Sequence, residues 1–177
     1  MPKEKENVMR QIRIGKVVLN IGVKDPVVES EKAYRLLEKI TGKKPVKTKA
    51  TKKARTFGIR KNLPIGAKVT VRGKEAEELL KELLQAVEMK LKPSCFDNEG
   101  NVNFGIKEYL DIPKMKYDPS IGVFGMNVCV QLERPGFRVK RRRLKRAKVG
   151  KNHRIKKEEA MDFMIKKFGV KIVEKEE

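Results

Sequence analysis

Several residue types that carry chemistry are rare in this chain of 177 residues. It has no Trp, one His and two Cys, and aromatic residues make up only 6%. Cys95 and Cys129 lie far apart without Cys-x-x-Cys spacing, so we expect neither a disulfide framework nor a zinc site. His153 lies among cations with no Ser or Cys beside it, which makes it a poor general base. These scarcities argue against nucleophilic or zinc-dependent catalysis, and we expect no cofactor and no metal.

Long apolar runs are also lacking. No uninterrupted apolar stretch approaches the ~18 residues that span a bilayer, and residues 1–6 mix charges without the apolar segment of a signal peptide. The chain nevertheless has 39% hydrophobic residues, enough for a core. We therefore expect a cytoplasmic protein without a membrane partner, folded as one domain or one domain with an extension.

Acidic residues are missing from two long segments. Residues 42–74 contain 12 Lys or Arg and residues 134–157 contain 13, with no Asp or Glu in either. The other 120 residues hold 19 bases and 23 acids, so these two segments account for the formal net charge of +21. Acid-free runs repel themselves unless a polyanion neutralises them. Neither run has the apolar stripe of an interfacial helix, so RNA or DNA is a better partner than an anionic membrane.

The remaining pattern mixes strands and helices. Alternation predicts strands over residues 12–23, 46–50, 67–72, 102–106 and 126–132. Apolar residues at helical spacing predict a helix that begins at Asp25 and Pro26 and ends at Gly42, a second between Gly73 and Pro93, and a third over 158–168. Residues 51–64 and the Pro- and Gly-rich stretch 111–124 are predicted to be loops.

The strands have one apolar and one polar face. In the first strand Leu19 and Ile21 oppose Lys16 and Asn20, and the later strands repeat this division. The pattern predicts a two-layer α+β fold, a mainly antiparallel sheet with helices packed on one face and the other face open for RNA. A polar sheet face is ordinary, but the neighbouring 42–74 run favours contact with phosphate oxygens and ribose hydroxyls. Few aromatic residues lie on this face, so base stacking is not indicated.

The charge pattern also suggests an organisation of the chain. We expect a core RNA-binding domain over residues 1–133 that includes a basic loop at 42–64. A basic extension over 134–157 and a C-terminal helix over 158–177, packing back on the core, would follow. Like charges oppose compaction, so we expect the extension to be mobile in the free protein.

Six motifs occur in a characteristic order. They are KVVLNIGV at residues 16–23, TGKKPVKTKA at 41–50, FGIR at 57–60, PIGAKVTVRG at 64–73, GNVNFGIKE at 100–108 and FGMNV at 124–128. Over nearly the whole chain they resemble the universal large-subunit ribosomal protein family that binds 5S rRNA, universal protein five. The 134–157 segment is similar to that of archaeal and eukaryotic members, and the chain is identified as a member of the archaeal type.

The resemblance implies a structural role without catalysis. Family members attach 5S rRNA to the large-subunit rRNA in the central protuberance, next to other 5S-associated ribosomal proteins. Asn20 and Thr70 match RNA-contacting positions, whereas Lys43 replaces a Gln of bacterial relatives, which would exchange an amide hydrogen bond for a phosphate ion pair. The 111–124 loop resembles the region that faces the small subunit and is a candidate bridge contact.

Two sets of contact residues follow from the charge pattern and the resemblance. The candidate rRNA-binding residues are Lys16, Asn20, Lys43, Lys44, Thr48, Lys68, Thr70, Arg72, Arg138, Arg141, Arg142 and Arg143. A second loop resembles the one that reaches the P-site tRNA, through Lys52, Lys53, Arg55, Phe57, Gly58, Arg60 and Lys61.

Two other functions are consistent with parts of the sequence. A metal-dependent nuclease would need clustered carboxylates, for which Asp97, Glu99, Asp111 and Asp118 are the candidates, but turn formation is the commoner role of such residues. A DNA-compacting protein is not excluded by charge, because phosphate contacts carry no sequence information.

Overall fold

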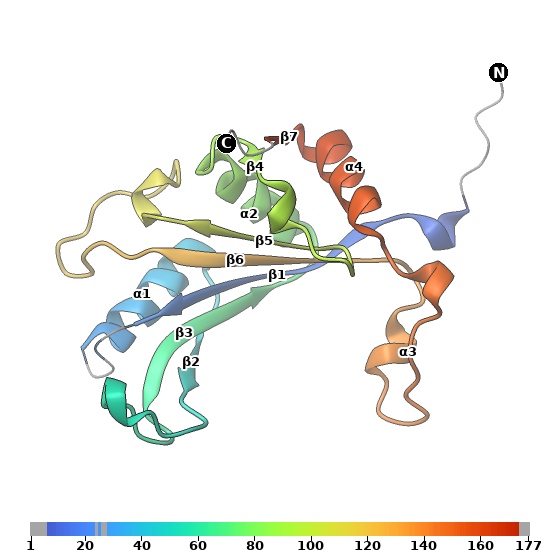
Figure 1. The fold of residues 1–177 in the computed structure, drawn as a ribbon. Helices are drawn as coiled ribbons and strands as arrows, with labels where there is room; N and C mark the ends of the chain where they lie inside the picture. The colour runs from blue at the N-terminus through green and yellow to red at the C-terminus, as the bar shows by residue number, and fades with distance from the viewer. Residues whose placement is uncertain (1–6, 24, 26–27, 174–177) are drawn as a thin grey trace.

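A five-stranded antiparallel sheet forms the centre of the computed structural model, which describes residues 7–23, 25 and 28–173 (Figure 1). The strands are β1 (Arg13–Gly22), β2 (Val46–Lys49), β3 (Pro64–Val71), β5 (Asn101–Ile106) and β6 (Met126–Glu133). Their order across the sheet is β2-β3-β1-β6-β5, and each pair of neighbours is antiparallel. All five predicted strands are present, although β3 begins at Pro64, three residues before its predicted start.

Three helices provide the second layer: α1 (Glu29–Thr41), α2 (Lys74–Gln85) and α4 (Lys157–Phe168). Leu36, Leu80 and Met164, one from each helix, are fully buried in a single core with the apolar face of the sheet. The short helix α3 (Arg138–Arg141) lies in the basic segment and buries no residue. The predicted α+β fold is confirmed.

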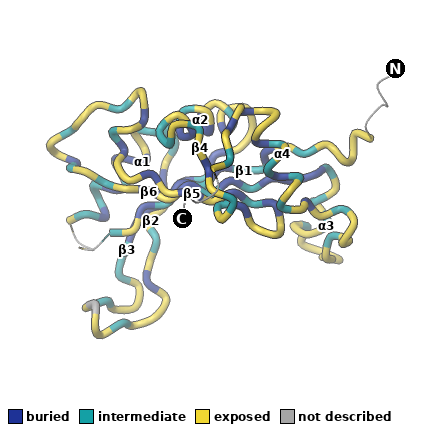
Figure 2. The backbone as a smooth tube through the Cα atoms, turned by 45° about the horizontal axis from the view of Figure 1, so that its top comes forward, coloured by how far each residue is buried: buried dark blue, intermediate teal, exposed yellow. Residues whose placement is uncertain are grey.

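The central strands show the predicted alternation. Val17, Leu19 and Ile21 of β1 are buried, whereas Lys16 and Asn20 between them are partly exposed. None of the helices in the described part of the chain covers these intervening positions, and Figure 2 shows burial concentrated along the strands. The sheet therefore has one sealed face and one open face.

Helix boundaries differ from prediction in two places. The first described turn of α1 starts at Glu29, whose N–H donates to the carbonyl of Asp25 at 3.2 Å, while the N–H of Asp25 donates to Glu29 Oε2 at 3.1 Å. The proposed role of Pro26, like the charge pattern of residues 1–6, lies outside the described residues. Helix α2 stops well before Pro93, because Glu88 and Met89 adopt positive φ angles of 54° and 57° that a right-handed helix cannot contain.

A small second sheet was not predicted. Strand β4 (Lys90–Leu91) pairs in parallel with β7 (Lys171–Ile172), which follows α4. Two residues are too few for an alternating pattern to be recognised. The pairing ties the C-terminal end of the described chain to the segment after α2.

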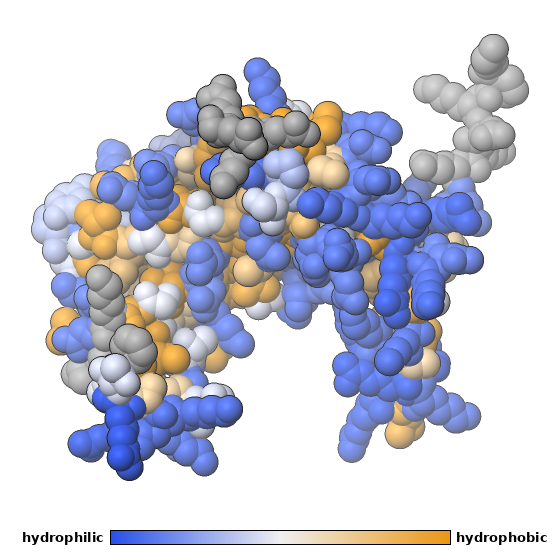
Figure 3. Space-filling view, viewed as in Figure 1, coloured by the Kyte–Doolittle hydropathy of each residue, from blue (hydrophilic) through white to orange (hydrophobic). Residues whose placement is uncertain are grey.

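Two basic segments project from the body. The β2–β3 loop (residues 50–63) and the basic extension (residues 134–157, with α3) both reach below the sheet in the view of Figure 1, at its two ends. The space-filling view shows that both projections are mainly hydrophilic (Figure 3).

Candidate nucleic-acid interface

Polar side chains from three adjacent strands form a row across the open face. Asn20 of β1 stands opposite Lys68 of β3 and Asn127 of β6, and Asn127 stands opposite Gly105 of β5. Directly opposed residues on one sheet face lie within about 5.5 Å of each other. This row thus combines two amides and an ammonium group from three adjacent strands.

The next rows contain the other predicted sheet residues. Thr70 is opposite Val18, which is opposite Cys129, and Lys16 is opposite Gln131. The structure therefore places Lys16, Asn20, Lys68 and Thr70 on one face, as the strand period predicted. Asn103, Asn127 and Gln131 lie on the same face and were not among the candidate contacts, although the same period identifies them.

A shallow depression of about 400 Å³ marks one end of this face. Asn20 and Asn127 line it together with Gly22, Gly105 and residues at the start of β6. The two glycines carry no side chain that could shield the asparagine amides. Hydrogen-bond donors on a shallow, solvent-accessible surface are suited to the sugar-phosphate backbone of RNA.

The β2–β3 loop presents a compact basic tip. Its 3₁₀ turn, Arg55–Phe57, ends at Gly58, whose φ of 64° is in the left-handed region. Ala54 and Ile59 exchange backbone hydrogen bonds of 3.0 Å, which close the tip. All five cations predicted to contact tRNA are exposed on this loop: Lys52, Lys53, Arg55, Arg60 and Lys61.

Three other candidate cations of the 42–74 run are Lys43, Lys44 and Arg72. The Lys43 ammonium is 2.5 Å from the carboxylate of Glu75 in α2, and it therefore lies against the helical layer. Lys44, two residues before β2, and Arg72, directly after β3, are exposed. Thr48, opposite Gly66, is partly exposed at the β2 edge.

Glu133, at the end of β6, anchors the basic extension to the sheet. Its side chain is only 8% exposed; Oε1 lies 3.2 Å from Arg13, and Oε2 accepts a hydrogen bond from Arg141. Gly15 provides the space, since a Cβ at this position would stand 2.8 Å from the Glu133 carboxylate. The candidate RNA contact Arg141 is thus already paired within the protein.

Glu159 of α4 forms a second anchor. Arg134 Nη2 donates to Glu159 Oε1 at 2.9 Å, and the Lys156 N–H donates to Oε2 at 2.9 Å, which caps the helix. Burial alone would raise the pKa of Glu159, but the Lys156 N–H and the Arg134 guanidinium outweigh it and lower this pKa from its ordinary value of 4.5.

The outer part of the basic extension leaves cations exposed. Arg138 and Arg143 are exposed, and Arg142 is partly exposed, with its Nε donating to the Lys145 carbonyl at 2.7 Å. The ends of the extension, by contrast, are held by buried Arg134 and Ile155. The mobility expected for the segment stays a prediction, restricted by this geometry to the outer part.

Two of the four carboxylates considered for a nuclease have close structural partners. Asp97 accepts hydrogen bonds from Asn98 N and Asn101 Nδ2, and Asp118 accepts from Ser120 and pairs with Lys39 at 3.1 Å. The Ser120 hydroxyl and the Lys39 ammonium lower the pKa of Asp118. Within residues 7–23, 25 and 28–173, no three His, Cys, Asp or Glu side chains cluster in a way that could hold a metal ion.

The 111–124 loop buries some of its apolar residues and exposes others. Ile112 and Ile121 are buried, and Tyr109 Oη accepts a hydrogen bond from Asp118 N at 3.1 Å. Tyr117 and Val123 remain exposed on its outer surface. Across the described part of the chain, no helix has the length and hydrophobicity needed to cross a membrane.

The sequence also matches known families and proteins. The family described as "Ribosomal protein L5" matches residues 7–60, and the one described as the C-terminus of the same ribosomal protein family matches residues 64–163. The large ribosomal subunit protein uL5 of Sulfurisphaera tokodaii is 54% identical over 169 residues, which cover 95% of this chain and 96% of the relative.

Two further archaeal proteins with the same name are similar to this chain over nearly its whole length. The corresponding protein of Nanoarchaeum equitans is 53% identical over 95% of this chain and 99% of its own length. That of Sulfolobus acidocaldarius is 50% identical over 97% of this chain and 96% of its own length.

Proposed function

Because this chain belongs to the uL5 family of large ribosomal subunit proteins, we propose that it binds 5S rRNA through the open sheet face and the basic extension. In this role it attaches 5S rRNA to the large-subunit rRNA in the central protuberance, beside other 5S-associated ribosomal proteins. The family is non-catalytic, which removes the nuclease alternative.

The open polar face carries the proposal. Its rows join amides, a hydroxyl and ammonium groups from neighbouring strands, with no helix above them. Fixed donors can position an RNA backbone, while the basic extension adds charge at one end of the sheet. A second contact, of the β2–β3 loop with P-site tRNA, is supported by five exposed cations around the glycine-containing tip.

Two further assignments belong to this proposal. The exposed Tyr117 and Val123 of the 111–124 loop offer apolar area for a bridge to the small subunit. Residues 1–133 form the core RNA-binding domain, residues 134–157 the basic extension, and residues 158–177 a C-terminal segment whose helix α4 packs on the core.

Salt-dependent binding of 5S rRNA tests the proposal. Asn20→Ala should weaken binding about fivefold, the equivalent of one hydrogen bond, without changing the slope of log affinity against log salt. Lys68→Gln should lower that slope by about 0.7 to 0.9, because one phosphate contact is lost. Gln85→Ala, at an exposed amide at the end of α2, is the matched control and should leave affinity and slope unchanged.

Competition with duplex DNA tests the remaining alternative, a DNA-compacting protein. Equal masses of duplex DNA should displace 5S rRNA poorly if the fixed donors recognise folded RNA. Equal displacement by the two polymers, or an unchanged affinity of the Asn20→Ala variant, would contradict the proposed mode of binding.

A further inference from the structure

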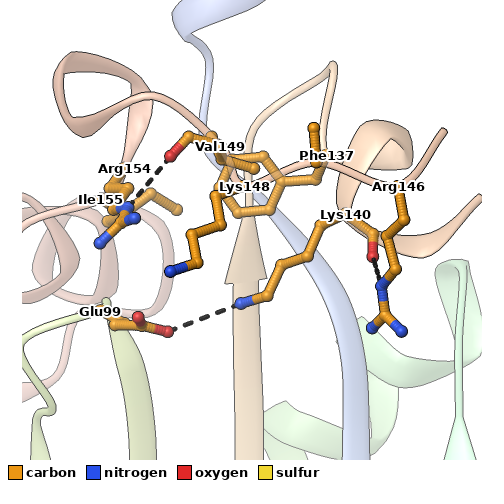
Figure 4. A pocket seen from close by; sticks show the side chains of 9 residues that line it. Glu99, Phe137, Lys140, Arg146, Lys148, Val149, Arg154 and Ile155 are labelled. Carbon is orange, nitrogen blue, oxygen red and sulfur yellow. Dashed lines mark hydrogen bonds and ion pairs between the residues drawn. The ribbon is translucent and has the colours of Figure 1, made fainter.

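A cavity of about 520 Å³ lies where the basic extension meets the turn before β5 (Figure 4). Its lining comes from the extension except for one residue of the turn, and it consists of Glu99, Phe137, Lys140, Arg146, Ala147, Lys148, Val149, Arg154 and Ile155. None of the candidate contact residues named above lines this cavity.

A close approach of the Gly100 backbone to the Ile155 side chain builds the cavity. Gly100 has a φ of 79°, and a Cβ there would stand 2.6 Å from Ile155 Cγ2, so only glycine lets the turn pack against the extension. Ile155 is 1% exposed and contributes an apolar wall together with Val149 and Phe137. The same approach brings Glu99 to the edge of a surface made of cations.

The cations are arranged around a single carboxylate. Lys140 and Lys148 extend toward Glu99, whereas Arg146 lies on the far side of Lys140 (Figure 4). Lys140 Nζ is 3.7 Å from Glu99 Oε2, too long for a hydrogen bond, and the two side chains are 53% and 56% exposed. Arg146 and Arg154 are oriented by carbonyls, Arg146 Nε at 2.6 Å from Lys140 O and Arg154 Nε at 3.2 Å from Val149 O.

This combination is suited to a nucleobase with phosphates on either side. A phosphate at Glu99 would meet a like charge, whereas the apolar wall and the Phe137 ring can contact the face of a base. A carboxylate has two acceptor oxygens and no donor. Among the four bases only guanine offers two adjacent donors on its Watson–Crick edge, N1–H and N2–H, which fit these two oxygens.

We propose that the cavity binds an unstacked guanine of RNA, with Glu99 accepting hydrogen bonds from N1–H and N2–H. The four cations of the lining neutralise the phosphates on either side of that nucleotide; they are Lys140, Arg146, Lys148 and Arg154. The assignment rests on the proposed RNA-binding function and adds to it a base-specific contact outside the open sheet face.

Short RNAs with equal charge provide the test. The full chain is titrated with single-stranded pentanucleotides of four uridines around a central G, A, C or U, and the methyl NMR signals of Ala147, Val149 and Ile155 report local binding. Because the phosphates are identical, any preference reflects the base. We expect the central G to bind about tenfold more tightly than the other three, the discrimination of a bidentate contact.

Variants separate the guanine contact from charge and stability. Glu99→Gln should reduce the preference to less than twofold, since the amide keeps only one acceptor, while Glu108→Gln, an exposed glutamate elsewhere, should retain it. Lys148→Gln should weaken all four pentanucleotides alike. Thermal unfolding of each variant shows whether the fold is intact.

Three outcomes would overturn the inference. They are equal affinities for the four RNAs, an unchanged preference in the Glu99→Gln variant, and larger shifts of the three signals with a pentaglutamate peptide than with the guanine RNA. Affinity for 5S rRNA is measured in parallel. Tight 5S binding without guanine preference would reject the pocket alone, whereas preference without 5S binding would reject the proposed function and leave the pocket standing.

Discussion

The two basic projections carry charge of the same sign but are held in place differently. In the β2–β3 loop, no ion pair links Lys52, Lys53 or Arg55 to any described carboxylate, and backbone hydrogen bonds between Ala54 and Ile59 close the tip. The basic extension is instead tied to the body by Glu133 and Glu159.

The difference shows how an acid-free segment can be neutralised in part by its own protein. Arg134 pairs with Glu159 of α4, 25 residues away, and Arg141 pairs with Glu133, the residue directly before the extension. The outer cations of the extension and those of the loop keep their charge available to a polyanion. We therefore expect the two ends of the extension to be fixed to the body and its outer cations to remain available to bind RNA. The cations at the tip of the β2–β3 loop should also remain available.

The largest expected effect concerns the apolar anchor of the extension. Ile155→Ala should lower the free energy of unfolding by about 3 kcal/mol, because a buried side chain is replaced by a cavity. Leu144→Ala, at a residue 78% exposed in the same segment, should change it by less than about 0.5 kcal/mol. Urea denaturation measures both, and equal effects would show that the extension lacks this anchor.

Removing the buried carboxylate should have the next largest effect. Glu133→Gln should destabilise the protein by about 1.5 kcal/mol, since charge-assisted hydrogen bonds to Arg13 and Arg141 are weakened while both guanidiniums can still reach water. Lys53→Gln in the β2–β3 loop is the counterpart and should have almost no effect. Limited proteolysis should cleave the extension faster in the first variant only; faster cleavage in neither would contradict the anchoring role.

Each projection contains a glycine, and replacing the two glycines by alanine should have different effects on the backbone. Gly58→Ala forces a left-handed φ of 64° on alanine, at a cost of about 1 kcal/mol, and should speed hydrogen exchange of the Ile59 amide about fivefold. Gly150→Ala has a φ of −56°, which alanine adopts freely, so no loss is expected. A Cβ has open space at both positions, so steric clash cannot explain a difference.

The smallest expected effect depends on pH. The lowered pKa of Glu159 means that the unfolded chain binds more protons than the folded one just below pH 4.5, so stability should rise with pH in that window. The contribution is lost as the pH falls through the folded-state pKa. It should not exceed about 0.5 kcal/mol, because the side chain is 41% exposed and water screens the pair.

Matched variants measure this contribution. Glu159→Gln should flatten the acid limb of the stability curve relative to Glu158→Gln, the neighbouring substitution. Identical curves would mean that the Arg134 pair adds nothing. The loop cations have no comparable carboxylate among the described residues, so no corresponding change is expected when they are replaced.

Local patterns predicted the sheet and its open face, because alternation with period two assigns Asn20 and Leu19 to opposite sides without knowledge of the fold. The order of the strands and the rows across them depend on long-range pairing. Lys68 and Asn20 become neighbours only through the β1–β3 register, which a single sequence does not contain.

The charges were harder to predict than the strands. The acid-free window suggested that Lys43 and Arg141 are both free for RNA, whereas Glu75 and Glu133 lie outside the windows and reach them in the folded chain. The cavity at Glu99 was missed for the same reason: the turn before β5 and the extension are brought together by Gly100 and Ile155.

The place of the last core residues in the chain has a consequence for synthesis. All five strands of the main sheet have left the exit tunnel once Glu133 has emerged, but Met164, Phe168 and the β7 partner of β4 come later. A nascent chain therefore displays all five strands of its open sheet face while part of its hydrophobic interior still lacks its cover. Binding of rRNA at that stage would have to precede closure of the interior, so newly made protein is vulnerable to aggregation until α4 arrives.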